Sequence, residues 1–168
     1  MRTLLLSLLL TCGLAAGSIA QETQVGFGTV NANPDDPVEV TAQRLNVSEA
    51  DGAAIFSGDV IIVQGQMRLT APRVKVKYDD ATGDVSSMEA TGGVTLVSGD
   101  EAAEASRADY DVADGMIVMT GNVLLTQGRS ALTSDRMDVD LNDNTAVMRG
   151  SVKTVLHRNQ SGGEGSSN

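Results

Sequence analysis

A unit of about 29 residues, which occurs four times, constrains the fold of this chain more than any other feature. Each copy joins a strand of alternating apolar and polar residues to a second strand that starts with Gly-x-Val about 14 residues later. The alternating strands begin at Thr41, Thr70, Ala105 and Thr133, and the second strands begin at Gly58, Gly92, Gly121 and Gly150. Such a period is typical of stacked β-structure in which each unit contacts its neighbours. The repeat therefore predicts a long surface or groove rather than one enclosed catalytic pocket.

The alternation within each copy predicts an all-β domain. Val74 and Val76 fall on one side of a strand and Arg73 and Lys75 on the other, which is the period of a half-buried strand. Turn signals such as Asn142-Asp143-Asn144 separate the paired strands, and no segment has a convincing helical period. A second glycine follows the first in three copies, and we interpret these second glycines as corners at which the sheet curls over on itself. They are Gly65, Gly99 and Gly128.

One face of the predicted sheet is a continuous lane of aliphatic side chains. The chain has only two Phe, two Tyr and no Trp, so few large rings are available to fill an interior. Two interpretations remain open: the lane is plugged by its own aliphatic residues, or it is partly unfilled and admits a flexible hydrocarbon. The predicted interior positions are Leu45, Val47, Val60, Ile62, Val74, Val76, Val94, Leu96, Val123, Leu125, Met137 and Val139.

The ends of the chain differ in composition from the repeats. Residues 1–20 have the positive start, short apolar stretch and small-x-small end of a cleaved secretory signal. We expect a flexible lead-in at 21–37, a single folded domain at 38–158 and a disordered Gly/Ser tail at 159–168. Cleavage removes Cys12, the only cysteine, and leaves 11 Lys+Arg against 22 Asp+Glu. So acidic a protein is a poor partner for nucleic acid.

No residue pattern in the chain predicts catalysis. His157 is the only histidine, and no nucleophile motif accompanies it. Two groups of carboxylates lie at predicted turns or on polar strand faces without calcium-ligand spacing, so we interpret them as solvated charges. We therefore expect no enzyme activity, no metal site and no cofactor. The two groups are Asp79, Asp80 and Asp84, and Asp138, Asp140 and Asp143.

Three segments of the repeat resemble the signature of the LptA/OstA-like family of lipopolysaccharide-transport proteins. They are residues 54–65 (AIFSGDVIIVQG), 69–76 (LTAPRVKV) and 118–128 (VMTGNVLLTQG), and the resemblance extends over roughly 38–157. It implies an open, twisted β-jellyroll in the periplasm whose interior positions bind the acyl chains of lipid A. The implied partners are lipopolysaccharide, an inner-membrane LptC-like protein, an outer-membrane LptD-like translocon and further copies of the chain. Ser98-Gly99 departs from the Gln-Gly pair of the other copies.

The terminal strands are the expected joints of a head-to-tail bridge. Exposed strand edges present unpaired N–H and C=O groups that can pair with another copy by β-augmentation. We expect Val38 and Val40 in the first strand, and Val152 and Val155 in the last, to form these joints. Two alternatives share the open ends: a β-solenoid-like structural filament with a dry core, and a related LptC-like component that stays anchored in the membrane.

Overall fold

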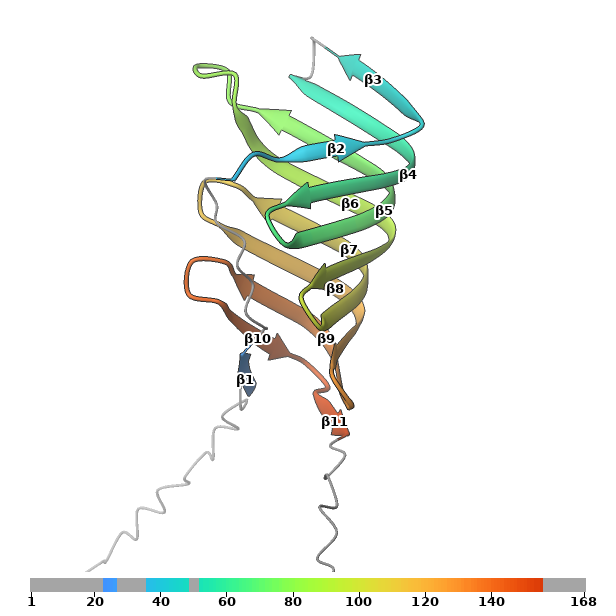
Figure 1. Ribbon diagram of the computed structural model, residues 1–168, viewed down its shortest axis with the longest axis vertical. Helices are drawn as coiled ribbons and strands as arrows, with labels where there is room; N and C mark the ends of the chain where they lie inside the picture. Colours follow the sequence, from blue (N-terminus) through green and yellow to red (C-terminus); the bar gives the residue numbers. More distant parts are fainter. Residues whose placement is uncertain (1–22, 27–35, 49–51, 156–168) are drawn as a thin grey trace, which may run out of the picture.

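A computed structural model of the chain describes residues 23–26, 36–48 and 52–155, and these form a single antiparallel sheet of 11 strands. The strand order is β1-β10-β9-β8-β7-β6-β5-β4-β2, with β3 also beside β4 and β11 also beside β9 (Figure 1). No helix occurs in these residues, which confirms the all-β prediction. The strands are β1 (Thr23–Gly26), β2 (Glu39–Thr41), β3 (Arg44–Ser48), β4 (Ala53–Gln64), β5 (Met67–Tyr78), β6 (Val85–Ser98), β7 (Glu101–Asp111), β8 (Met116–Gln127), β9 (Ser130–Asp140), β10 (Thr145–Arg149) and β11 (Lys153–Val155).

The long strands β4 to β9 run up and down through consecutive hairpins. Gly65, Gly99 and Gly128 each adopt φ +57° in the tight turns between these strands, a backbone conformation that glycine takes without steric cost. These second glycines of the repeat therefore make hairpin turns and not the predicted corners. The described residues contain no helix with the length and apolar character that a membrane span requires.

The corner of the sheet is made by the first glycine of each repeat. At Gly121-Asn122 both residues have positive φ and the pairing of β8 with β9 shifts register, which marks a bulge that bends the strand. A Cβ at Gly121 would lie 2.8 Å from Ser106 Oγ on β7, and that hydroxyl donates a hydrogen bond to the Gly121 carbonyl. Equivalent bulges occur at Gly58-Asp59 and Gly92-Gly93, so the bends stack into one continuous corner.

The corner divides the sheet into two half-sheets that each long strand crosses. The β3–β10 half-sheet contains β3, β10, β1 and the parts of β4–β9 that pair in line with them. The β2–β11 half-sheet contains β2, β11 and the remaining parts of β4–β9. In Figure 1, β2 and β3 lie at one end of the molecule and β1, β10 and β11 at the other.

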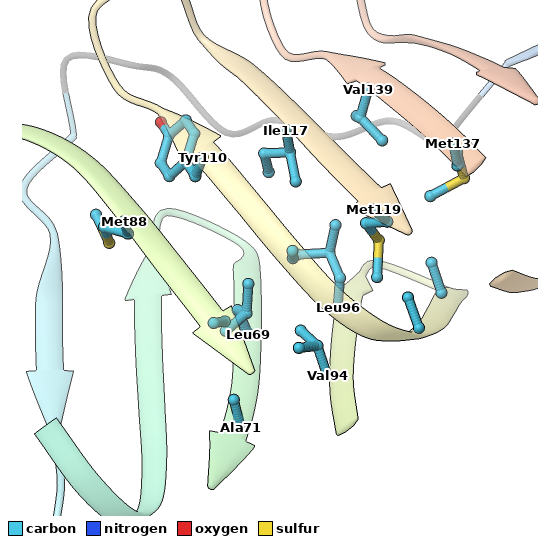
Figure 2. Packing of buried hydrophobic residues seen from close by; sticks show 14 of the residues in the cluster. Leu69, Ala71, Met88, Val94, Leu96, Tyr110, Ile117, Met119, Met137 and Val139 are labelled. Carbon is cyan, nitrogen blue, oxygen red and sulfur yellow. The ribbon is translucent and has the colours of Figure 1, made fainter. Parts of the chain in front are cut away.

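The core lies between the two half-sheets and consists of rows of apolar side chains that run across the strands. Figure 2 shows members of both rows pointing into this space. Each buried aliphatic residue of this kind contributes roughly 1.5–3 kcal/mol to folding. In the β3–β10 half-sheet, directly paired residues form the row Val47, Ala54, Val76, Met88, Tyr110, Ile117, Val139 and Ala146. The β2–β11 half-sheet contributes Val40, Ile62, Leu69, Leu96, Ala103, Leu125 and Leu132.

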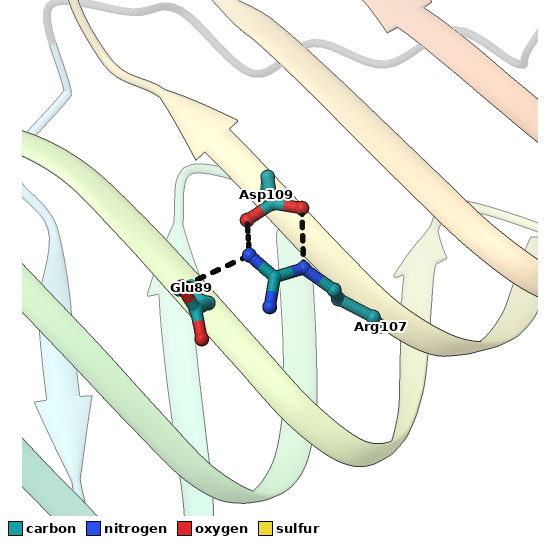
Figure 3. Close-up of polar contacts among 3 residues, drawn as sticks. All are labelled: Glu89, Arg107 and Asp109. Carbon is teal, nitrogen blue, oxygen red and sulfur yellow. Dashed lines mark hydrogen bonds and ion pairs between the residues drawn. The ribbon is translucent and has the colours of Figure 1, made fainter.

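The opposite face of the sheet carries charged side chains that pair locally. Arg107 on β7 forms a bidentate ion pair with Asp109, with N–O distances of 2.7 Å from Nε and 2.5 Å from Nη2. The same Nη2 lies 2.9 Å from a carboxylate oxygen of Glu89 on β6 (Figure 3). These hydrogen bonds raise the pKa of Arg107 above its usual range. Because all three side chains are more than 40% exposed, the cluster belongs to the solvated outer face.

Candidate functional site

Ten of the twelve predicted interior residues line the space between the half-sheets. None of the ten has more than 3% of its surface exposed, and Val60, Val74, Leu96 and Leu125 have none. In this structure the middle of the lane is therefore filled by the protein's own side chains and closed to water. The ten are Val60, Ile62, Val74, Val76, Val94, Leu96, Val123, Leu125, Met137 and Val139.

Leu45 and Val47 differ from the other ten because they are exposed rather than buried. They pair with Phe56 and Ala54, so their side chains lie on the interior face of the sheet. Leu45 is nevertheless 56% and Val47 64% exposed, because β3 is an edge strand with no described neighbour beyond it. The apolar lane thus opens to solvent at the β3 end of the molecule.

A hydrogen bond between two buried side chains joins the half-sheets across the interior. Tyr110 Oη on β7 donates to Gln64 Oε1 on β4 at 2.9 Å, and Gln64 Nε2 donates to the Asp36 carbonyl at 3.1 Å. Burial raises the pKa of Tyr110, so the phenol keeps the proton it donates. Sequence reasoning missed this pair. The available signal was Gln64 at the end of an apolar strand and Tyr110 two residues after Ala108 on an alternating strand.

A polar row borders the apolar lane in the β2–β11 half-sheet, beside Gln64. Ser98, Glu101 and Gln127 pair directly across β6, β7 and β8. Gln127 Nε2 donates to Glu101 Oε1 at 3.0 Å, whereas Glu101 Oε2 and the Ser98 hydroxyl are buried without a hydrogen-bond partner among the described residues. Burial raises the pKa of Glu101. Ser98, the departure from the Gln-Gly pattern, therefore lies in line with Gln64 and Gln127.

The four predicted joint residues lie at the two ends of the β2–β11 half-sheet. Val38 and Val40, at β2, are partly buried and pack against the core, as does Val152 before β11. Val155 on β11 is 56% exposed. Since β2 pairs only with β4 and β11 only with β9 among the described strands, each has an unoccupied edge. The strand predicted to contain Val38 and Val40 is the short β2, and β3 follows it as a separate strand in the other half-sheet.

Asp79 and Asp140, among the candidate carboxylates, have structural roles in turns. Asp138 differs, because it is buried on β9 and forms ion pairs with Arg136 and Arg149, so its prediction as a solvated charge was wrong. The Asp79 carboxylate accepts hydrogen bonds from the backbone N–H groups of Ala81 and Thr82, both at 2.9 Å, which lower its pKa. The Asp140 carboxylate plays the same part in the turn between β9 and β10, where it accepts hydrogen bonds from the N–H groups of Asn142 and Asp143. Within the described part of the chain no group of His, Cys, Asp or Glu side chains could hold a metal ion. His157 lies outside the described residues.

The surface of the described residues has hollows with mixed polar and apolar linings. One of about 270 Å³ is lined by charged residues such as Lys75 and Asp109 together with apolar residues such as Met116 and Val118. Three more, of about 320 to 370 Å³, recur along the corner beside the glycine bulges. None of them opens into the apolar lane at its fully buried leucines, so the lane and its ends remain the stronger candidate site.

The fold and the site together define a class of protein: an open antiparallel β-jellyroll with an apolar interior and, among the described strands, unoccupied strand edges at its ends. Sequence comparison identifies the family. The chain belongs to the LptA/(LptD N-terminal domain) LPS transport protein family, whose profile matches residues 39–145. The predicted resemblance is thereby confirmed.

Individual relatives are distant. An uncharacterized protein of Rhizobium meliloti is 26% identical over 113 residues, or 63% of this chain and 61% of the relative. The lipopolysaccharide export system protein LptH of Pseudomonas aeruginosa is 31% identical over 71 residues, or 40% of each chain. The matches thus span less than two thirds of either relative.

The same fold occurs in a solved structure. The crystal structure of LptH, the LptA homologous periplasmic component of the conserved lipopolysaccharide transport device of Pseudomonas aeruginosa, matches with a TM-score of 0.66. The match covers 76% of this chain and 99% of that one at 16% identity. At so low an identity the likeness establishes the fold, and it confirms the predicted open jellyroll.

Proposed function

We propose that this chain is a periplasmic lipopolysaccharide carrier that shields lipid A acyl chains in its interior while they pass between the membranes. The observation that carries the proposal is the continuous apolar row from Val40 to Leu132, which crosses the strands along the length of the sheet. An acyl chain of about a dozen methylenes costs roughly 10 kcal/mol to expose to water, at about 0.8 kcal/mol per group. An aliphatic lining offsets that cost without directional contacts, so a lipid can slide along it.

Because side chains fill the interior in this structure, an acyl chain can enter only if side chains move or the half-sheets separate. Leu45 and Val47 provide one route, because they expose the apolar lane at the β3 end. The side of the interior away from the corner is the other route, where Gln64 and Tyr110 hold the half-sheets together. Side entry would break this bond, and Ser98, Glu101 and Gln127 would then offer polar partners to a headgroup beside the buried chains.

Assembly and location complete the proposal. Copies stack head to tail through the free edges of β2 and β11, and related domains on an inner-membrane LptC-like protein and an outer-membrane LptD-like translocon continue the stack. The signal-like residues 1–20 favour export to the periplasm, as does the description of LptH as a periplasmic component. The family is one of transport proteins, and we expect no enzyme activity.

Photo-crosslinking at two neighbouring residues of β4 tests the carrier function. Ile62 points into the interior and is 3% exposed, whereas Ile61 lies on the other face of the same strand. A photoreactive residue at Ile62 should form adducts with lipopolysaccharide, and one at Ile61 should not. Equal labelling at both positions, or none at Ile62, would reject a lipid-filled interior.

A structural filament with a dry core is the second candidate, and the packing of the interior favours it. Val60, Val74, Leu96 and Leu125 have no exposed surface, as a permanently solid core requires. This candidate predicts end-to-end assembly without adducts at Ile62 under any lipid concentration. Mass spectrometry of the exported protein distinguishes the carrier from the membrane-anchored alternative, because an anchored chain would retain residues 1–20.

A further inference from the structure

The chain's own first strand occupies the edge of the sheet where a following copy would add in the β3–β10 half-sheet. β1 pairs antiparallel with β10, from Thr23 opposite Met148 to Gly26 opposite Thr145. Although β1 precedes β2 in the sequence, the two strands lie at opposite ends of the molecule (Figure 1). The edges of β2, β3 and β11 have no such cover among the described strands.

Strand direction shows that β1 and the β3 of a following copy compete for one place. Every pairing from β4 to β10 is antiparallel, and six of them separate these strands, so β4 and β10 run in the same direction. Because β3 is antiparallel to β4, a second copy stacked head to tail would bring its β3 antiparallel to β10. That is the direction β1 already takes. With β1 in place, an incoming β3 would meet a parallel neighbour.

The apolar surface of β3 fits the edge that β1 covers. Ala146 and Met148 of β10 are fully buried on the interior face, and the residues opposite them in β1 are Val25 and Thr23. β3 has the same alternation with larger apolar residues, Val47 and Leu45, which are more than half exposed on the interior face of their own copy. Replacement of β1 by β3 would therefore bury apolar surface that the single chain leaves in water.

Chain length sets a further condition on β1. Eight strand spacings separate β1 from β2, which is about 38 Å along the sheet at roughly 4.8 Å per spacing. The chain between Gly26 and Glu39 can reach roughly 45 Å when fully extended. The connection between β1 and β2 can therefore span this separation with little length to spare.

We propose that β1 is an intramolecular cap on β10 that must leave when the β3 of a second copy joins the sheet, so that the chain limits its own end-to-end assembly. The proposal rests on the proposed head-to-tail function. It assigns residues 23–26 a regulatory role, in which release of β1 opens the joint in the β3–β10 half-sheet.

A disulfide staple between β1 and β10 tests the cap. Gln24 and Val147 are directly opposite, so Gln24→Cys with Val147→Cys, in a Cys12→Ser chain, can lock β1 in place. Analytical ultracentrifugation should show that oxidation raises the concentration for half-assembly at least tenfold, and that reduction restores it. Ser87→Cys with Asp111→Cys, a directly opposite pair on β6 and β7 away from both ends, is the control and should be insensitive to oxidation.

A variant that weakens the cap should have the opposite effect. Gln24→Pro with Val25→Pro removes two consecutive N–H groups, one of which must face β10, and should lower the concentration for half-assembly several-fold. Equal assembly of oxidised and reduced staple variants would overturn the cap while leaving end-to-end assembly intact. The cap is also overturned if the pair fails to oxidise in dilute protein, or if oxidation of assembled protein links separate chains. Absence of assembly in every form would reject the head-to-tail function itself, and the cap with it.

Discussion

The hydroxyl of Tyr110 and the side-chain amide of Gln64 hold the two half-sheets together through a buried hydrogen bond of 2.9 Å. Tyr110 is on β7 in the β3–β10 half-sheet, and Gln64 is on β4 in the β2–β11 half-sheet. The bond spans 46 residues of sequence and joins strand ends that lie away from the glycine bulges of the corner. It therefore bears on both the stability of the closed jellyroll and the access of cargo.

Removal of this hydroxyl should weaken the closed state. Tyr110→Phe takes one donor from the buried Gln64 amide oxygen, and we expect the free energy of unfolding in urea to fall by about 1–2 kcal/mol. Adducts between lipopolysaccharide and a photoreactive residue at Ile62 should increase, because the half-sheets separate more easily. Tyr78→Phe is the control, since Tyr78 is 39% exposed and should change neither measurement. A loss of stability with unchanged labelling would show that the bond does not govern access.

The raised pKa of Glu101 predicts a stability effect that depends on pH. A carboxyl whose folded pKa is raised contributes fully below its unfolded pKa, near 4.5, and loses that contribution as pH rises through the folded pKa. Glu101→Gln resembles the protonated side chain and should be more stable than the original chain at pH 7, modestly because the carboxyl is partly solvated. Thermal melts should show this advantage shrinking as pH falls from 7 through the folded pKa and vanishing below about pH 4.5, the unfolded pKa. An advantage that is constant from pH 4 to 7 would contradict the ionisation argument.

The corner glycines should tolerate substitution less than the turn glycines. Gly121→Ala must place a Cβ 2.8 Å from Ser106 Oγ at φ +83°, whereas Gly99→Ala meets open space at φ +57°. We expect Gly99→Ala to cost about 1 kcal/mol, the penalty of positive φ, and Gly121→Ala at least about 3 kcal/mol. Urea denaturation of the two variants measures the difference. Equal losses of unfolding free energy would mean that the Ser106 side chain moves aside easily and that the corner is not tightly packed.

A proline in the last strand should block the joint in the β2–β11 half-sheet. Val155 is exposed on β11, whose outer edge is unoccupied among the described strands. Val155→Pro should abolish end-to-end association in light scattering while the monomer stays folded. Val155→Ala keeps the N–H group and should associate nearly as well as the original chain. Unchanged assembly of the proline variant would exclude β11 from the joint.

Much of the fold could be predicted from the sequence because strand alternation has a period of two residues. That period places Val74, Ile62 and Leu96 on one face wherever the strand lies in the sheet. The corner was harder to assign, because both glycines of a repeat permit positive φ. Whether Gly58 or Gly65 makes the bend depends on the register with the next strand, and the sequence of one strand does not contain that register.

The candidate site was predicted less completely than the fold. Its apolar lane follows from alternation, but burial depends on which strands have neighbours. Leu45 and Val47 have the same local pattern as buried residues and are exposed only because β3 is at an edge. The link between Gln64 and Tyr110 depends on the folding of one half-sheet over the other, which no local pattern records.

The repeat, the all-β class and the alternation of apolar residues within a strand follow from the amino-acid sequence, because they depend on residues near one another in the chain. Only the tertiary structure decided that the lane is closed along its middle, that it opens at β3 and that β1 covers the edge of β10. These features arise where distant segments meet. Their energies depend on which surfaces remain in water after folding, and that is a property of the whole sheet.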